Sequence, residues 1–177
     1  RRVLFRSIKP DNLMITKDDV VKVSDFGLAK EMSSGELTQT GDVMGTPAYM
    51  SPEQCDRSDL DTRTDIYSLG AAYYRAATGV LPFNAPTPVA MMYKHKHEAL
   101  IPPKQYMPNL PDDVGHVIER MMEKRPEDRF PSMEAVADAI DKVLQGEPLP
   151  GLDSTLKISG QTPPPPSDAE GPPLPSF

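Results

Sequence analysis

The sequence predicts an α+β domain that is mostly helical, with one small β-hairpin ahead of a bundle built around a buried helix. Three observations support this fold class. Residues 13–23 contain two short runs of β-type residues separated by a polar turn. Residues 62–78 form a helical pattern that is apolar on nearly all sides, as in a helix at the centre of a domain. Amphipathic patterns with the helical period of 3.6 residues follow it.

The predicted hairpin pairs residues 13–16 with residues 20–23 across the turn Lys17-Asp18-Asp19. Residues 24–52 then contain four glycines and many Ser and Thr, without a regular period. Because a long irregular loop inside a compact domain is usually functional, this segment is expected to carry part of a site.

The central helix is expected over Thr62 to Thr78, with Thr64 or Asp65 capping its start and Gly79 ending it. Outer helices are predicted from Thr87 to about His97, over residues 112–124, and from a Ser132 cap to Leu144.

Some side chains on these helices are assigned to surface or packing roles. His95 and His97 lie two apart, hence on different faces, so they are not expected to bind a metal, and both are predicted to be solvated. Methionines are expected to fill irregular gaps, with a Met-rich partner surface as the alternative. These are Met91, Met92, Met107, Met121, Met122 and Met133.

Composition excludes several classes of protein. The formal net charge of −7 argues against a nucleic-acid binder, which needs a basic stripe. A single cysteine, Cys55, excludes an internal disulfide and a Cys-rich zinc site. No run approaches the roughly 20 apolar residues of a membrane span.

Domain boundaries follow from a shift in composition. Residues 145–177 carry nine prolines and few large apolar residues, so they are predicted to form an extended, disordered linker. Residues 8–144 are the predicted folded domain. The linker leads to a membrane span or sensor domain in one reading and is a plain disordered end in the other.

Polar residues gather at the ends of the two predicted strands. Asp25-Phe26-Gly27 follows the second strand, and Asn12 precedes the first. An Asn and an Asp at neighbouring strand ends can supply oxygens to Mg²⁺, whose shell is completed by phosphates and water. Lys9 adds a cation nearby. Together these groups are what phosphoryl transfer requires.

Five motifs in order resemble the protein kinase family, and in flavour the bacterial Hanks-type Ser/Thr kinases. They cover most of the predicted domain. They are the catalytic loop Ile8-Lys9-Pro10-Asp11-Asn12, the metal-binding Asp25-Phe26-Gly27, the activation-segment end Gly45–Glu53, the central-helix start Asp65–Gly70 and the loop Lys124–Arg129. The resemblance implies a kinase-like C-terminal lobe without its N-terminal lobe.

The family pattern implies roles at the nucleotide. Asp25 would chelate the Mg²⁺ that bridges the ATP phosphates, and Asn12 would hold a second ion. Lys9 would touch the γ-phosphate, so these three residues form the ATP site. Thr46 would orient the catalytic loop and shape the pocket after the target residue.

Other implied roles are structural or regulatory. Glu53 would pair with Arg129, and Asp65 would hold the catalytic-loop backbone through its amides. The alternatives are a surface ion pair and a plain helix cap. Thr38 and Thr40 are candidates for autophosphorylation, since a phosphate there would order the loop if a basic pocket received it; the alternative is a pair of solvated hydroxyls.

The catalytic aspartate of the pattern is absent, because Ser7 occupies its position and Phe5 stands where His is expected. One explanation is a pseudokinase. The other is that residues 1–7 are not native. They can be encoded by AGA CGT GTG CTC TTC CGA TCT, which matches the end of a common short-read library adapter. We favour the adapter, fused where the native sequence was lost.

Three readings of function remain. The parent protein is a kinase that transfers the ATP γ-phosphate to Ser/Thr of protein substrates, with a cytoplasmic kinase domain and a membrane anchor left open. Alternatively it is a pseudokinase scaffold, or a small-molecule kinase of similar fold. The 177-residue chain itself is expected to be inactive, because it carries no Gly-rich loop, strand lysine or adenine hinge.

Overall fold

The computed structural model describes residues 8–18, 20–23, 47–56 and 60–149. Predictions on Ser7, Asp25, Thr38, Thr40 and Thr46 therefore lie outside the described residues. The elements are η1 (Pro10–Asn12), β1 (Leu13–Ile15), β2 (Val21–Val23), η2 (Pro47–Tyr49), α1 (Pro52–Asp56), α2 (Thr62–Thr78), α3 (Pro88–His97), α4 (Pro103–Tyr106), α5 (Asp112–Met121), η3 (Pro126–Asp128) and α6 (Met133–Gln145).

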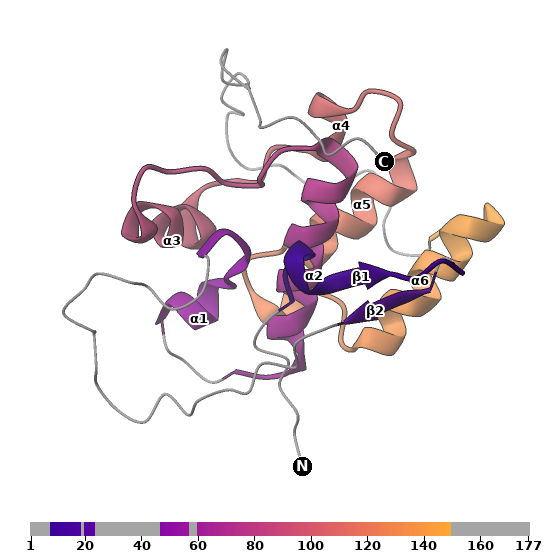
Figure 1. Cartoon of the computed structure of the whole chain (residues 1–177), viewed down its shortest axis with the longest axis horizontal. Helices are drawn as coiled ribbons and strands as arrows, with labels where there is room; N and C mark the ends of the chain where they lie inside the picture. The colour runs from indigo at the N-terminus through magenta and orange to yellow at the C-terminus, as the bar shows by residue number, and fades with distance from the viewer. Residues whose placement is uncertain (1–7, 19, 24–46, 57–59, 150–177) are drawn as a thin grey trace.

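The predicted hairpin is confirmed. Strands β1 and β2 pair antiparallel, with Leu13 opposite Val23 and Ile15 opposite Val21. The turn is closed by the Thr16 amide, which donates to the Val20 carbonyl at 2.9 Å. The hairpin lies on the face of the molecule turned to the viewer in Figure 1, in front of parts of α2 and α6.

Helix α2 is the centre of the bundle, as predicted, and it packs against α4, α5, α6 and η2 (Figure 1). Its bounds agree with the prediction, and Gly79 ends it in the left-handed conformation (φ 78°). The predicted cap is wrong. Asp61 caps the helix instead, because its carboxylate accepts from the Arg63 amide at 2.8 Å.

The helices around α2 agree with the sequence except at one end. Helix α3 begins after a Thr87 cap, whose Oγ1 accepts from the Ala90 amide at 3.1 Å. Helix α5 stops at Met121 rather than at Lys124. The carbonyls of Glu123 and Lys124 accept hydrogen bonds from an arginine side chain described below, so this segment turns away from the helix.

Helix α6 starts at the expected Ser132 cap and ends at Gly146, which has φ 69°. Beyond it, Leu149 is buried in the core cluster that also contains Ile66 and Val117. The predicted linker therefore begins too early, because the packed part of the chain reaches at least Leu149.

Two short helices, α1 and α4, were not predicted. Both begin with a proline, whose fixed φ suits a first helical position. Each has five residues or fewer, which is too short to show a period. Among the described residues, no helix has the length and apolar character required to cross a membrane.

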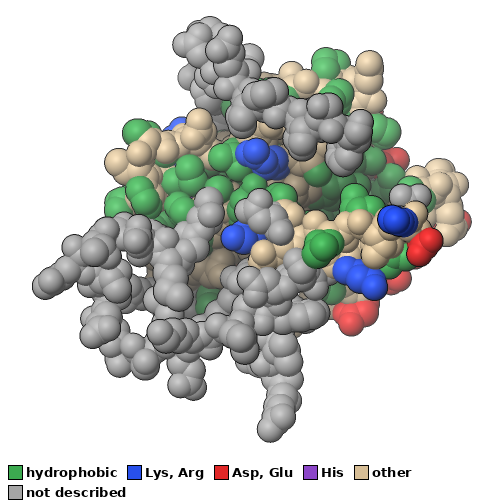
Figure 2. Space-filling view, viewed as in Figure 1, with side chains coloured by type: hydrophobic (Ala, Val, Ile, Leu, Met, Phe, Trp, Pro, Cys, Tyr) green, Lys and Arg blue, Asp and Glu red, His purple; other side chains and the backbone are tan. Residues whose placement is uncertain are grey.

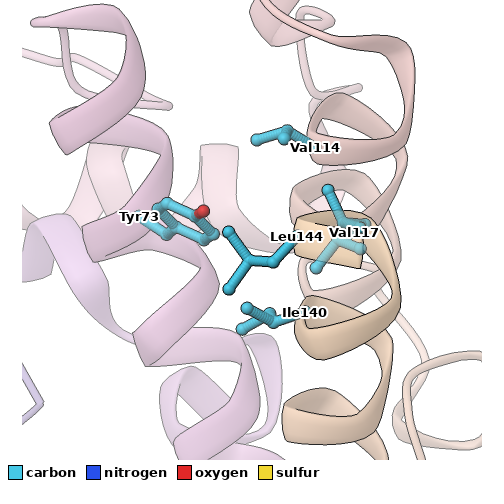
Figure 3. A pocket seen from close by; sticks show the side chains of 6 residues that line it. Tyr73, Val114, Val117, Ile140 and Leu144 are labelled. Atoms are coloured by element: carbon cyan, nitrogen blue, oxygen red, sulfur yellow. The ribbon is translucent and has the colours of Figure 1, made fainter. Parts of the chain in front are cut away.

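A small pocket opens between α2, α5 and α6 (Figure 3). Its lining is apolar except for the Tyr73 hydroxyl, and Leu144 leans across it. A ligand site normally adds a few convergent polar groups, which this lining lacks. We therefore treat the pocket as a packing gap, lined by Tyr73, Val114, Val117, Ile140, Val143 and Leu144.

Candidate functional site

The described part of the predicted catalytic loop is a turn of 3₁₀ helix that leads into β1. Lys9 precedes the turn in extended conformation, and Pro10 occupies its first position. The Asn12 amide donates to the Lys9 carbonyl at 2.9 Å. Asn12 is buried and Lys9 is half-buried, so the turn fixes both at the start of the strand.

The register of the hairpin relates this turn to the end of β2. Because Leu13 pairs with Val23, the last residue of β2 lies beside the first residue of β1, directly after Asn12. Asp25 follows Val23 by two residues in the sequence and lies outside the described part of the chain. The predicted convergence of Asn12 and Asp25 stays a prediction.

Residues 47–51, here called the platform segment, lead into α1. Ser51 is fully buried and caps this helix in a reciprocal pair. Its Oγ accepts from the Gln54 amide at 3.3 Å, and its own amide donates to Gln54 Oε1 at 2.9 Å. This is a capping box, and Ser51-Pro52-Glu53-Gln54 fits its sequence pattern, which was a readable signal. The box fixes the position of Glu53.

Glu53 and Arg129 form a buried bidentate ion pair. Arg129 Nη1 donates to Oε1 at 2.7 Å and Nη2 donates to Oε2 at 2.8 Å. Their side chains are 8% and 0% exposed, which excludes the alternative of a surface pair. Thr64 Oγ1 adds a hydrogen bond to Oε1 at 2.9 Å. Burial raises the pKa of Glu53, but the hydrogen bond and charge of Arg129 outweigh it and leave the pKa below its usual value.

The Arg129 guanidinium uses its remaining donors on three backbone carbonyls. Nε donates to Glu123 at 2.7 Å, Nη1 to Arg63 at 2.9 Å and Nη2 to Lys124 at 3.0 Å. With the two bonds to the carboxylate, all five N–H groups of the side chain are satisfied. Its Cζ also lies 4.9 Å from the centre of the Tyr67 ring. One side chain thus ties α1, the start of α2 and the loop after α5 together.

Asp65 lies in the first turn of α2 and is buried. Because Asp61 is the cap, the alternative reading of Asp65 as a helix cap is wrong. A buried carboxylate is costly unless it is paired or hydrogen-bonded. Its predicted role, holding the catalytic-loop backbone, stays a prediction.

The prediction that His95 is solvated is wrong. His95 is fully buried, and its Nδ1 lies 2.9 Å from the Tyr67 hydroxyl oxygen. Its ring meets the Phe83 ring edge-on at 4.9 Å. Helix α3 packs against α1 and η2, and Met91, one turn before His95, is buried as well. His97, on another face, is exposed as predicted.

Lys124 connects α3 to the loop that holds Arg129. Its Nζ donates to the His95 carbonyl at 2.7 Å and lies 4.2 Å from the centre of the Phe83 ring. Burial lowers the pKa of Lys124 to about 8. A cation at the last carbonyls of a helix satisfies acceptors that lack intrahelical partners. No local sequence pattern predicts this contact, because 29 residues separate His95 from Lys124 along the chain.

Comparisons with known proteins agree with this arrangement. A probable serine/threonine-protein kinase of Clostridium perfringens is 41% identical over 141 residues, which are 80% of this chain and 21% of that protein. The serine/threonine-protein kinase PknB of Mycobacterium tuberculosis is 38% identical over 148 residues, 82% of this chain and 24% of PknB. The tyrosine-protein kinase MasK of Myxococcus xanthus is 40% identical over 142 residues, 80% of this chain and 22% of MasK.

The chain thus spans between a fifth and a quarter of the length of these relatives. The family description of the protein kinase domain matches residues 1–139, a range that includes the unexpected Phe5-Arg6-Ser7. Since the match covers well over half of its residues, the chain belongs to the protein kinase family.

Proposed function

We propose that the parent protein transfers the γ-phosphate of ATP to Ser or Thr of protein substrates. Kinases of this family use ATP and Mg²⁺, and the bound nucleotide supplies the phosphoryl group. The observation that carries the proposal is the hairpin register, which lays the end of β2 beside buried Asn12.

The nucleotide side of the site is assigned to three residues. Asn12 offers an amide oxygen and Asp25 a carboxylate, and hard oxygen donors of this kind suit Mg²⁺. Lys9, next to the same turn, supplies a cation for the γ-phosphate. The described residues suit a magnesium–nucleotide complex, because buried Asn12 offers an oxygen ligand at a fixed place, the start of β1.

The substrate side of the site is assigned to Thr46 and to the platform segment that follows it. Support comes from the Ser51 capping box and the Glu53–Arg129 pair, which hold the carboxyl end of this segment on α2. In the proposal Asp65 supports the catalytic loop from the buried first turn of α2. Thr38 and Thr40 are the proposed autophosphorylation sites, to be mapped by mass spectrometry.

Transfer is tested in the full reading frame of the parent protein, with ³²P-labelled ATP and casein. We expect Asp25→Asn and Asn12→Ala each to lower incorporation by about a hundredfold or more, because charge stabilisation at the phosphates is lost. Lys17→Ala, in the exposed hairpin turn, is the control and should leave incorporation unchanged. Phosphoamino-acid analysis should give phosphoserine or phosphothreonine; phosphotyrosine alone would contradict the proposed specificity.

A pseudokinase is the second candidate, favoured by Ser7 at the position of the catalytic aspartate. We propose instead that residues 1–7 are translated adapter. Amplifying and sequencing the locus from source DNA decides between them: His-Arg-Asp at positions 5–7 supports the enzyme, and a genomic Phe-Arg-Ser supports the pseudokinase. The 177-residue chain alone should give no measurable incorporation, and robust ³²P transfer by it would overturn that expectation.

A further inference from the structure

The buried face of α3 carries a titratable side chain that has no part in the proposed transfer. His95 is fully buried, yet the described structure shows no hydrogen-bond partner for its Nε2. Buried polar atoms are nearly always paired, so an unpaired one requires an explanation.

The protonation state of the ring follows from its surroundings. Burial and the charge of Lys124 lower the pKa of His95 to about 4, so the imidazole is neutral at pH 7 and carries one N–H. The Tyr67 hydroxyl is itself buried and needs an acceptor, and Nδ1 at 2.9 Å is the one it has among the described residues. If Nδ1 accepts, the hydrogen of the ring is on Nε2.

The ring lies against the platform segment. Element η2 packs on both α2 and α3, and Ala48 at its centre is buried. The backbone of Ala48 interacts with the His95 ring and acts to raise its pKa. That direction is the one a carbonyl oxygen produces, because an acceptor favours the protonated ring.

We propose that His95 is a positioning residue for the protein substrate: its Nε2–H donates to the Ala48 carbonyl and so holds the platform segment in place for an incoming peptide. The inference rests on the proposed kinase function and deepens it. His95 acts through the platform segment, which it joins to α2 by way of Tyr67, and it does not act on the phosphoryl group.

Two substitutions separate the two ring nitrogens. The Gln side chain of His95→Gln reaches about as far as Nε2 and keeps a donor there, whereas Asn in His95→Asn ends near Nδ1. In the 177-residue chain we expect His95→Asn to speed hydrogen–deuterium exchange of residues 47–51 about tenfold, and His95→Gln to stay within twofold of the parent chain. Unchanged protection of α2 amides shows that the fold is intact.

Tyr67→Phe is the second variant, for use if His95→Asn does not fold. It removes the donor to Nδ1 and leaves the ring free to change its tautomer, so faster exchange of residues 47–51 is expected again. Equal exchange in the Asn and Gln variants, or no change at residues 47–51 in any folded variant, would overturn the proposal.

In the full reading frame, His95→Asn should raise the KM for casein about fivefold, the worth of one hydrogen bond, with kcat and the KM for ATP within twofold. His95→Gln should restore the KM. A fall in kcat at unchanged KM contradicts a positioning role. Because exchange requires no phosphotransfer, an inactive parent protein would sink the kinase proposal and leave the exchange result standing.

Discussion

The Glu53–Arg129 pair and the β1–β2 hairpin differ in how completely their side chains are bonded or buried. Every donor of the Arg129 side chain is used, and the carboxylate receives a third hydrogen bond from Thr64. On the hairpin, four apolar side chains are more than half exposed, and Figure 2 shows hydrophobic atoms on that face. They are Met14, Ile15, Val20 and Val21.

This difference indicates that the two regions contribute unequally to the stability of the fold. The ion pair joins α1, α2 and the loop after α5, so the bundle holds itself together. The hairpin begins directly after Asn12. It gains little from burial, because burial contributes only about 25 cal/mol per Å² of apolar surface and these side chains stay in water. We therefore expect the bundle to set the free energy of unfolding and the hairpin to contribute little.

The largest effect is expected from Arg129→Met, which leaves the buried Glu53 carboxylate unpaired. We predict a loss of about 3–5 kcal/mol in the free energy of unfolding, measured by urea denaturation. Arg125→Met is the control, because Arg125 pairs with Glu127 on the surface. It should leave the midpoint unchanged, and similar shifts in the two variants would refute the ranking.

The second-largest loss of stability is expected in acid, where the buried His95 ring becomes protonated. Its pKa of about 4 lies below the ordinary 6.5, so the folded state binds the proton more weakly than the unfolded state. The stability that the neutral His95 ring contributes is therefore fully present above about pH 6.5. As the pH drops towards 4, the free energy of unfolding falls by about 3 kcal/mol.

The measurement is urea denaturation at pH 7, 5.5 and 4.5. His95→Gln should flatten the pH dependence relative to the parent chain, while His97→Gln on the exposed face should not. Carboxylates such as Glu53 titrate in all three proteins, so the difference between variants isolates His95. Parallel curves for His95→Gln and His97→Gln would rule out the buried imidazole as the cause.

Close packing inside the bundle is tested by Gly70→Ala. A Cβ at residue 70 would lie 2.8 Å from Met121 Cβ and 2.9 Å from Met122 Cγ, so α2 and α5 must separate or strain. Overpacking of this kind costs about 1–3 kcal/mol, seen as a lower melting temperature. At Gly115 in α5 nothing lies within 4 Å of an added Cβ. Gly115→Ala should raise stability by about 0.5–1 kcal/mol; destabilisation by both would contradict the packing argument.

The smallest effect is expected at the hairpin. Ile15 is 71% exposed, so Ile15→Thr keeps a β-branched residue and removes almost no burial. We predict a change within about 0.5 kcal/mol in the same denaturation assay. A loss above about 1 kcal/mol would show that the hairpin is packed after all and would end the contrast.

Local patterns predicted most of the fold. The two β-type runs and the apolar helix from Thr62 to Thr78 were readable because each contains its own period and its own end signals. The pairing of Glu53 with Arg129 came from family resemblance, since 76 residues separate the two partners. Asp25 and Thr46 lie outside the described residues, so that half of the site remains a prediction.

The errors have tertiary causes. Asp61, Thr64 and Asp65 are all residue types that cap helices well, so only the tertiary structure decides among them. Asp61 is the cap, and the Thr64 hydroxyl donates to Glu53 instead. Spacing placed His95 and His97 on different faces but could not tell which face meets η2. The helical pattern continues past Met121, but the carbonyls of Glu123 and Lys124 accept hydrogen bonds from the Arg129 side chain.

The burial of Leu149 in the core determines where this protein should be truncated or attached to another module. A fusion joined after Leu144 would remove Leu149 from the core cluster that contains Ile66 and Val117, and would expose hydrophobic residues of the bundle to water. Any tag, surface tether or neighbouring module is better attached beyond Leu149, so that this buried side chain stays in the core.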